Sequence, residues 1–157
     1  MILAAEFDRA FRLHQQGKLR EAFLRYDAIL KAEPRHAPAL HYSGVVLHQA
    51  GILTPAVERI RASLAIDPAP AEAWSDLAAA QLALSLRADA EASARRAIAA
   101  DVNHAAGWYQ LAQALQLQGR LPEALDSARR AAGITPGSAR YAGLIAQLEQ
   151  LQPDIQH

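Results

Sequence analysis

The stretch Ala105–Pro136, AAGWYQLAQALQLQGRLPEALDSARRAAGITP, decides the fold of this chain. It reads as two short helices joined by a turn at Gly119-Arg120. Its landmarks recur upstream at a fixed step of 34 residues, and these are the turn positions Gly17, Gly51, Ser85 and Gly119, the alanines Ala22, Ala56, Ala90 and Ala124, the positions Pro34, Pro68, Val102 and Pro136, and the pair Trp74 and Trp108. Four independent columns with one period indicate a repeat protein.

The composition fits stacked helices and excludes several classes of protein. A unit of this size cannot bury its own apolar face, so the units must stack on one another. Apolar residues make up 52% of the chain but aromatic residues only 6%, because alanine is abundant, and alanines bury a core only where helices approach closely. Basic and acidic residues both number 16, and this balance argues against nucleic acid as a partner.

The sequence gives no sign of a membrane or of disulfide chemistry. The chain has no cysteine. The N-terminal sequence MILAAEFDRAF has acidic residues at positions 6 and 8 and no basic start, unlike a signal peptide. No apolar run approaches the roughly 20 residues that a membrane span needs. We therefore expect a soluble, cytoplasmic protein.

The periodicity predicts one domain over residues 1–152. Its parts would be four helical repeats at about 3–36, 37–70, 71–104 and 105–138, a last helix at 139–151 that caps the open end, and a frayed tail at 153–157. Ser138 is expected to cap the last helix, and Thr54-Pro55 to begin the second helix of the second repeat. The third repeat is expected to be the least regular, with Leu82 taking over the packing of the leucine that Gln81 replaces.

Charges on the second helices indicate a solvated outer face. Three acid–base pairs are spaced four residues apart, Glu21 with Arg25, Glu91 with Arg95 and Asp126 with Arg130. Because acids lie one turn away, we interpret Arg95-Arg96 and Arg129-Arg130 as parts of a solvated convex face rather than as a patch for an anion or an acidic partner.

The pattern Trp108-x2-Leu111-Ala112-x2-Leu115, followed by Ala124-x3-Ala128 and Pro136, resembles the tetratricopeptide repeat. The resemblance covers residues 3–151. It implies an all-α fold, a right-handed superhelical solenoid of antiparallel helix pairs with four tetratricopeptide repeat (TPR) units plus a C-terminal capping helix. The matching columns are packing positions, so they imply the fold and leave the ligand open.

The resemblance also implies that the first helices of the pairs line a concave groove. The predicted groove residues form three rows, which are Phe7, His41, Ser75 and Tyr109, then Phe11, Val45, Ala79 and Gln113, and then His14, His48, Leu82 and Gln116, with Gln15 and Gln49 alongside. Such a groove is neutral and rich in histidine, glutamine and aromatic side chains. This composition suits an extended peptide or a partner helix.

Two specialised uses known in the family are not supported. Chaperone-binding members clamp a C-terminal carboxylate with groove lysines and asparagines, and the O-GlcNAc transferase superhelix carries an asparagine ladder. Here the only asparagine is Asn103, in a turn between repeats, and the only lysines are Lys18 and Lys31.

The sequence predicts no metal, cofactor or catalysis. His41 and His48 stand about 10.5 Å apart along a helix, too far to share a zinc ion on their own. Ordinary polar lining is the preferred interpretation of the histidines, with a pH-modulated groove as the alternative. The nucleotide-binding motif G-x4-G-K-[ST], the zinc motif H-E-x-x-H and the nucleophile motif G-x-S-x-G are all absent, and we expect no enzyme.

The function predicted from these features is a non-catalytic scaffold that binds a protein or peptide partner in its groove. One alternative is that the chain is the docking region of a larger bacterial enzyme of the glycosyltransferase or hydroxylase type, since the Ala/Arg-rich composition suggests a bacterial source in this family. Another is a homodimerising adaptor, because Ile2, Leu3, Phe7 and Phe11 leave an apolar N-terminal end.

Overall fold

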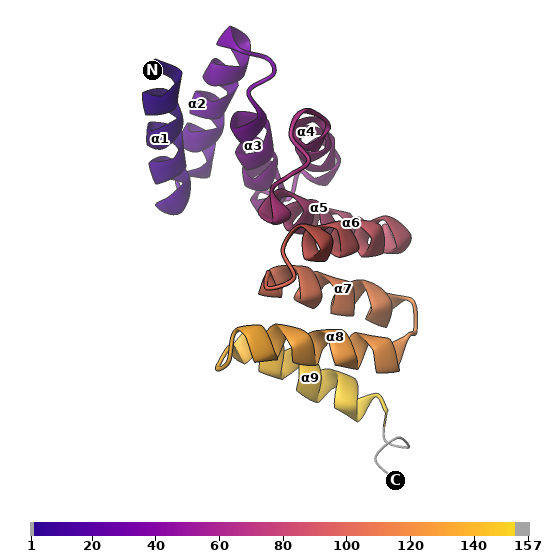
Figure 1. The fold of residues 1–157 in the computed structure, drawn as a ribbon. Helices are drawn as coiled ribbons and strands as arrows, with labels where there is room; N and C mark the ends of the chain where they lie inside the picture. The colour runs from indigo at the N-terminus through magenta and orange to yellow at the C-terminus, as the bar shows by residue number, and fades with distance from the viewer. Residues whose placement is uncertain (1, 153–157) are drawn as a thin grey trace. The chain divides into compact units, whose positions relative to one another are not determined.

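The computed structural model describes residues 2–152, and every regular element within them is an α-helix. The chain divides into two compact units, which we call unit 1 (Met1–Ala69) and unit 2 (Pro70–His157). Unit 1 contains α1 (Ile2–Gln15), α2 (Leu19–Ala32), α3 (Ala37–Gln49) and α4 (Leu53–Ile66). Unit 2 contains α5 (Ala71–Ala83), α6 (Arg87–Ala100), α7 (Ala105–Leu117), α8 (Leu121–Ile134) and α9 (Ala139–Gln150) (Figure 1).

Two helices lie in each predicted repeat, so the predicted all-α fold of helix pairs is confirmed. The extent of the domain, 1–152, stays a prediction, and the predicted tail at 153–157 falls outside the described residues.

The four turns inside the helix pairs share one backbone geometry. Gly17, Gly51 and Gly119 have φ values of 77°, 81° and 75°, and Ser85 takes their place with φ 59°. The amide that follows each of them donates to the carbonyl five residues earlier, as Arg120 N does to Leu115 O at 3.0 Å. This is the bond that closes a Schellman turn at a helix end. Ser85 therefore adopts the conformation that glycine adopts in the other repeats.

Small residues let the two helices of each pair approach closely. Two columns with the 34-residue period carry small residues that are all buried, Ala10, Gly44, Ala78 and Ala112 on the first helices and Ala22, Ala56, Ala90 and Ala124 on the second. The approach is tightest at Gly44, where an added Cβ would lie 2.6 Å from Cγ1 of Ile60 and 3.0 Å from the carbonyl oxygen of Ala56. Any side chain at residue 44 would therefore push α3 away from α4.

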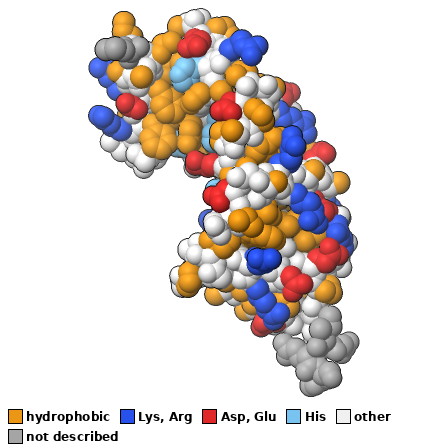
Figure 2. All heavy atoms as spheres, viewed as in Figure 1, with side chains coloured by type: hydrophobic (Ala, Val, Ile, Leu, Met, Phe, Trp, Pro, Cys, Tyr) orange, Lys and Arg blue, Asp and Glu red, His pale blue; other side chains and the backbone are white. Residues whose placement is uncertain are grey.

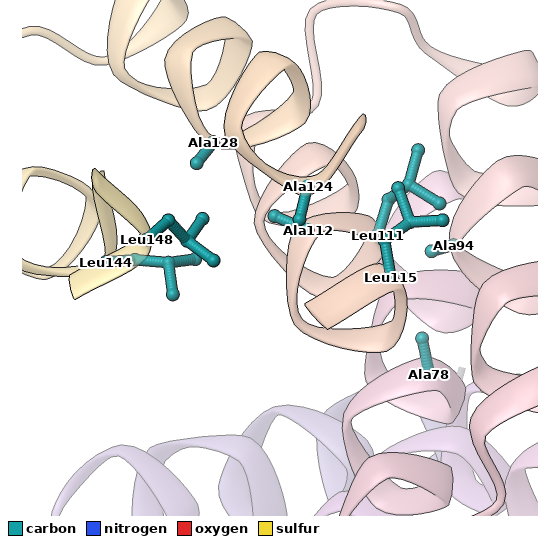
Figure 3. Close-up of a cluster of buried hydrophobic side chains, with 9 residues drawn as sticks. All are labelled: Ala78, Ala94, Leu111, Ala112, Leu115, Ala124, Ala128, Leu144 and Leu148. Atoms are coloured by element: carbon teal, nitrogen blue, oxygen red, sulfur yellow. The ribbon is translucent and has the colours of Figure 1, made fainter. Parts of the chain in front are cut away.

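In unit 2, alanines and leucines from all five helices form one cluster (Figure 3). Leu111 and Leu115 of α7 lie among alanines of its neighbours, and Leu144 and Leu148 of α9 close the cluster on the other side. Ser138 caps α9, since its side chain accepts from the amide of Tyr141 at 3.4 Å. The predicted capping helix thus buries its apolar face, although Leu151, predicted as its last residue, follows the helix and is 51% exposed.

Two local predictions are wrong. Gln81 remains buried because Ser93 donates to its amide oxygen at 2.6 Å, so Leu82 does not replace it in the core and stays half-buried. Helix α4 begins at Leu53, one residue before Thr54, and Ile52 is its N-cap without a side-chain hydrogen bond. Leu53 matches Leu19 and Leu121, the first residues of α2 and α8, so the repeat register overrides the capping signal.

Candidate functional site

The predicted groove residues of unit 1 gather around Tyr42 of α3. Phe7 and Phe11 of α1 stack with ring centroids 6.2 Å apart, and the rings of Phe11 and Tyr42 meet edge to face with centroids 5.2 Å apart. Phe7 lies 5.8 Å from the same tyrosine ring. Figure 2 shows hydrophobic side chains gathered over the part of unit 1 that holds α1 to α3, with a histidine among them.

His14 links α1 to both neighbouring helices. Its Nε2 lies 2.8 Å from Oε1 of Gln49, and its Nδ1 lies 3.5 Å from the hydroxyl of Tyr26. Burial, followed by the proximity of Tyr42, raises the pKa of Tyr26, so the phenol keeps its proton. In this arrangement the Tyr26 hydroxyl can donate to Nδ1 of His14, and Nε2–H of His14 can donate to the amide oxygen of Gln49.

The other predicted residues of unit 1 differ in their exposure. His41 is only 5% exposed, and its ring lies 4.3 Å from that of Tyr42, so it offers little surface to a ligand. Val45 and His48 are half-buried and Gln15 is exposed. The structure thus brings Phe7, Phe11, His14 and Gln49 together and leaves the remaining four at the margin or inside.

In unit 2 the predicted residues line a hollow with a volume of about 460 Å³. Tyr109, Gln113 and Gln116 come from α7, and the amide of Gln113 donates to the hydroxyl of Tyr109 at 3.4 Å. Ala79 and Leu82 of α5 also line this space. We call this space the amide hollow.

Ser75, the fourth predicted residue of unit 2, lies beneath this surface. It is 2% exposed, and its hydroxyl donates to Oε1 of Gln110 at 2.5 Å. Gln110, which sequence reasoning did not single out, therefore takes a place in the wall of the hollow that Ser75 does not reach. Tyr42 and Gln110, both missed, stand in one repeat column, two periods apart.

The neutral groove predicted from the sequence is corrected by Arg140 of α9. This side chain lines the amide hollow, and its guanidinium carbon lies 5.6 Å from the centroid of the Tyr109 ring. Tyr141 packs against the same ring at 5.2 Å. The hollow therefore carries a positive charge over an aromatic ring. Continuing the repeat register into α9 would have placed the capping helix beside the groove.

The outer arginines are occupied by the protein's own side chains. Arg96 lies over the ring of Trp74 at 4.7 Å, and Arg130 lies over Trp108 at 5.0 Å. Arg129 pairs with Glu149 at 3.4 Å. A second hollow of about 670 Å³ lies beside Trp108, but two of these arginines and Asp126 line it, and the indole N–H is already bonded to the carbonyl of Val102.

Two of the predicted acid–base pairs are replaced by other contacts. Glu91 and Arg95 form the expected ion pair at 2.9 Å. Arg25 instead lies 3.6 Å from Glu6 of α1, and the cation of Arg130 faces Trp108. The contacts of the outer face support its interpretation as a solvated surface.

Over residues 2–152, no three histidine, aspartate or glutamate side chains are placed to hold a metal ion. In the same range no helix is long and apolar enough to cross a membrane.

The family profile described as tetratricopeptide repeat matches residues 7–73 and 75–139. The chain belongs to the tetratricopeptide repeat family. No curated protein matches this TPR chain.

Solved structures of other TPR proteins have the same fold. MamA from Desulfovibrio magneticus RS-1 is 18% identical, with a TM-score of 0.85 over 98% of this chain and 87% of that one. TTC0263, a thermophilic TPR protein in Thermus thermophilus, is 18% identical, with a TM-score of 0.82 over 98% and 84%. The first TPR of Spaghetti (RPAP3), bound to the HSP90 peptide SRMEEVD, is 19% identical, with a TM-score of 0.72 over 75% and 94%.

Proposed function

We propose that this TPR chain is a non-catalytic scaffold that binds an extended segment of a partner protein on the inner face of its first helices. The observation that carries the proposal is the amide hollow of unit 2. Gln113 and Gln116 each offer an amide that can donate to and accept from a peptide main chain. Ala79 and Leu82 provide an apolar wall for the partner's side chains.

Arg140 adds a preference for an acidic partner. A guanidinium can bind a carboxylate through two parallel hydrogen bonds, and this one already stands at the wall of the hollow. The RPAP3 domain of the same fold is bound to a peptide rich in acidic residues, which supports this chemistry. The aromatic cluster of Phe7, Phe11 and Tyr42 would hold apolar side chains of a partner on unit 1.

Affinity capture from the source organism's lysate, read by mass spectrometry, tests the proposal. The full chain is compared with Tyr109→Ala/Gln113→Ala, which empties the amide hollow, and with Glu58→Ala, an exposed position on α4 that serves as a control. All three are first shown to have equal helix content. A partner retained by the wild type and the control but lost by the double variant supports the proposal, whereas equal binding by all three contradicts it.

Self-association through the N-terminal end is a second candidate, because Ile2 of α1 is 81% exposed. Light scattering over a range of concentrations would show a dimer that Ile2→Glu dissociates. A monomeric mass at all concentrations would contradict it.

A further inference from the structure

The two units differ at a place outside the predicted groove, where the second helix of one repeat meets the first helix of the next. In unit 1 this place is an open apolar hollow of about 350 Å³. We call it the α2–α3 hollow, and it is lined by Leu19, Arg20, Phe23, Val46, Leu47, Ala50 and Ile52. It shares no residue with the amide hollow or with the predicted groove residues.

In unit 2 the matching place, two repeat periods along the chain, is filled by polar side chains. Glu91 stands where unit 1 has Phe23, and it accepts from Arg120 at 2.8 Å and from Gln118 at 2.9 Å. Arg87, which matches Leu19, donates to the carbonyl of Leu117 at 3.1 Å. The chain's own hydrogen bonds therefore close the space between α6 and α7.

Among the described residues of unit 1, no counterpart of this polar network occurs. Arg120 is replaced by Ile52, which is 48% exposed, and Gln118 by Ala50. Both lie in the turn between α3 and α4, on the rim of the hollow. Leu24, four residues after Arg20 and so on the same side of α2, is 58% exposed and extends the apolar surface. An apolar hollow with an exposed apolar rim marks a contact surface rather than a solvated one.

The charge at the rim is positive and unpaired. Arg20 lines the hollow, and Lys18 precedes Leu19 at the N-cap of α2. Within residues 2–152 neither cation forms an ion pair, whereas Arg120 of unit 2 contacts the two carboxylates of Glu91 and Glu123. Cations left unpaired beside an apolar hollow complement an occupant that is both apolar and acidic.

We propose that the α2–α3 hollow binds a segment of a partner protein that carries a bulky aliphatic or aromatic side chain with an aspartate or glutamate close to it. The apolar side chain enters between Phe23 and Ile52, and the carboxylate meets Arg20. The site is independent of the amide hollow, so one TPR chain can hold two segments at once.

Selection from a library of displayed random peptides of about a dozen residues, with the full chain as bait, tests this proposal. The key variant is Ile52→Asp. This substitution removes the apolar rim and places a negative charge near Arg20. Aspartate at the N-cap of α4 is favourable for the helix, so the variant is expected to fold with an unchanged or higher Tm. Leu86→Asp makes the same change at the matching N-cap of α6 and is the control.

The expected peptides combine a bulky apolar residue with an acid, and they bind Ile52→Asp about tenfold or more weakly than wild type or Leu86→Asp. Arg20→Gln should weaken binding of the peptide about two- to fivefold. Replacing the acidic residue of the peptide by its amide should cause no further loss of affinity in this variant. Selected peptides that lack this pairing, or that bind Ile52→Asp like the wild type, would overturn the proposal. A dimer that Ile52→Asp dissociates would also overturn it, because a second copy would then occupy the hollow.

Discussion

Tyr26 in unit 1 and Ala94 in unit 2 hold the same place in their repeats, and so do Ile60 and Ala128. All four are fully buried. Ile60 requires more room than Ala128, and the chain provides it at the facing Gly44, where unit 2 has Ala78 and Ala112. The two units thus build one backbone arrangement from different volumes. The repeat period fixes where helices meet, and the size of the side chains can vary as long as facing positions compensate.

The largest effect is expected from breaking the aromatic core of unit 1. Tyr26→Ala should lower the free energy of unfolding by about 3–5 kcal/mol, because it removes a fully buried ring that contacts Phe7, His14 and Tyr42. Urea unfolding followed by circular dichroism measures the loss. Tyr26→Phe, which keeps the ring and removes only the contact with His14, should cost about 1.5 kcal/mol or less. Equal losses for the two variants would show that the hydroxyl, not the ring, stabilises unit 1.

The next largest effect is expected from Gly44→Ala, which should lower the free energy of unfolding by about 1–3 kcal/mol because the new methyl group meets Ile60 and the backbone of Ala56. Combining it with Ile60→Ala recreates the pairing of unit 2, so the double variant should lose less stability than the sum of the two single changes. Gly133→Ala on α8 is the matched control, since its methyl group would meet nothing within 4 Å. Strict additivity would contradict the volume compensation between the units.

The polar network of unit 2 should make the stability of this unit depend on pH in the acidic range. Burial alone would raise the pKa of Glu91, but hydrogen bonds from Gln118 and Arg95 and the charge of Arg120 outweigh it and lower the pKa below the ordinary 4.5. The stabilisation is therefore complete above about pH 4.5 and is lost as the pH falls through the folded-state pKa.

Hydrogen exchange of the α6 amides, from about pH 6 to about pH 3 and corrected for intrinsic rates, measures this effect. Wild-type protection should fall further than that of Glu91→Gln, which has lost the charge already. The matching helix α2, with Phe23 at this position, should show the same change in both proteins. Identical profiles for wild type and variant in α6 would exclude the network as the cause.

The smallest effect is expected at the turn of the third repeat. Ser85→Gly should stabilise the chain by about 1 kcal/mol or less, because glycine removes the strain of the left-handed conformation. The larger loss of backbone entropy that glycine suffers on folding offsets part of this gain. Thermal unfolding would register a small rise in Tm, with Gly119→Ser as the reverse change. A lower Tm for Ser85→Gly would mean that the serine side chain contributes to the turn.

The sequence predicts the fold well because the decisive residues act locally or at fixed intervals. Turn glycines and buried alanines follow from the 34-residue period, and even Ser85 keeps the turn. The last helix follows from its Ser138 cap and its helical spacing of apolar residues. The failures come from contacts that the period does not contain. Gln81 stays buried because Ser93, a residue on the next helix, satisfies its amide.

The candidate site was less predictable for the same reason. Positional analogy brings Tyr109, Gln113 and Gln116 to one hollow, yet it also assigns His41 and Ser75 to the open groove. His41 and Ser75 are buried by neighbours that the pattern does not specify, and Arg140 enters from a helix outside the four repeats. The α2–α3 hollow has no sequence signal of its own, since it becomes visible only when the matching positions of the two units are compared.

The open turns have a consequence for the design of new proteins from this chain. An added Cβ at Gly17, Gly51 or Gly119 would meet nothing within 4 Å, and the backbone bond that closes each turn reaches only into the last turn of the preceding helix. These three points are therefore suited to the insertion of foreign loops, tags or reporter domains without disturbing the helices on either side. Because only the glycine itself lacks side-chain contacts in these turns, each repeat can be labelled separately at its own glycine.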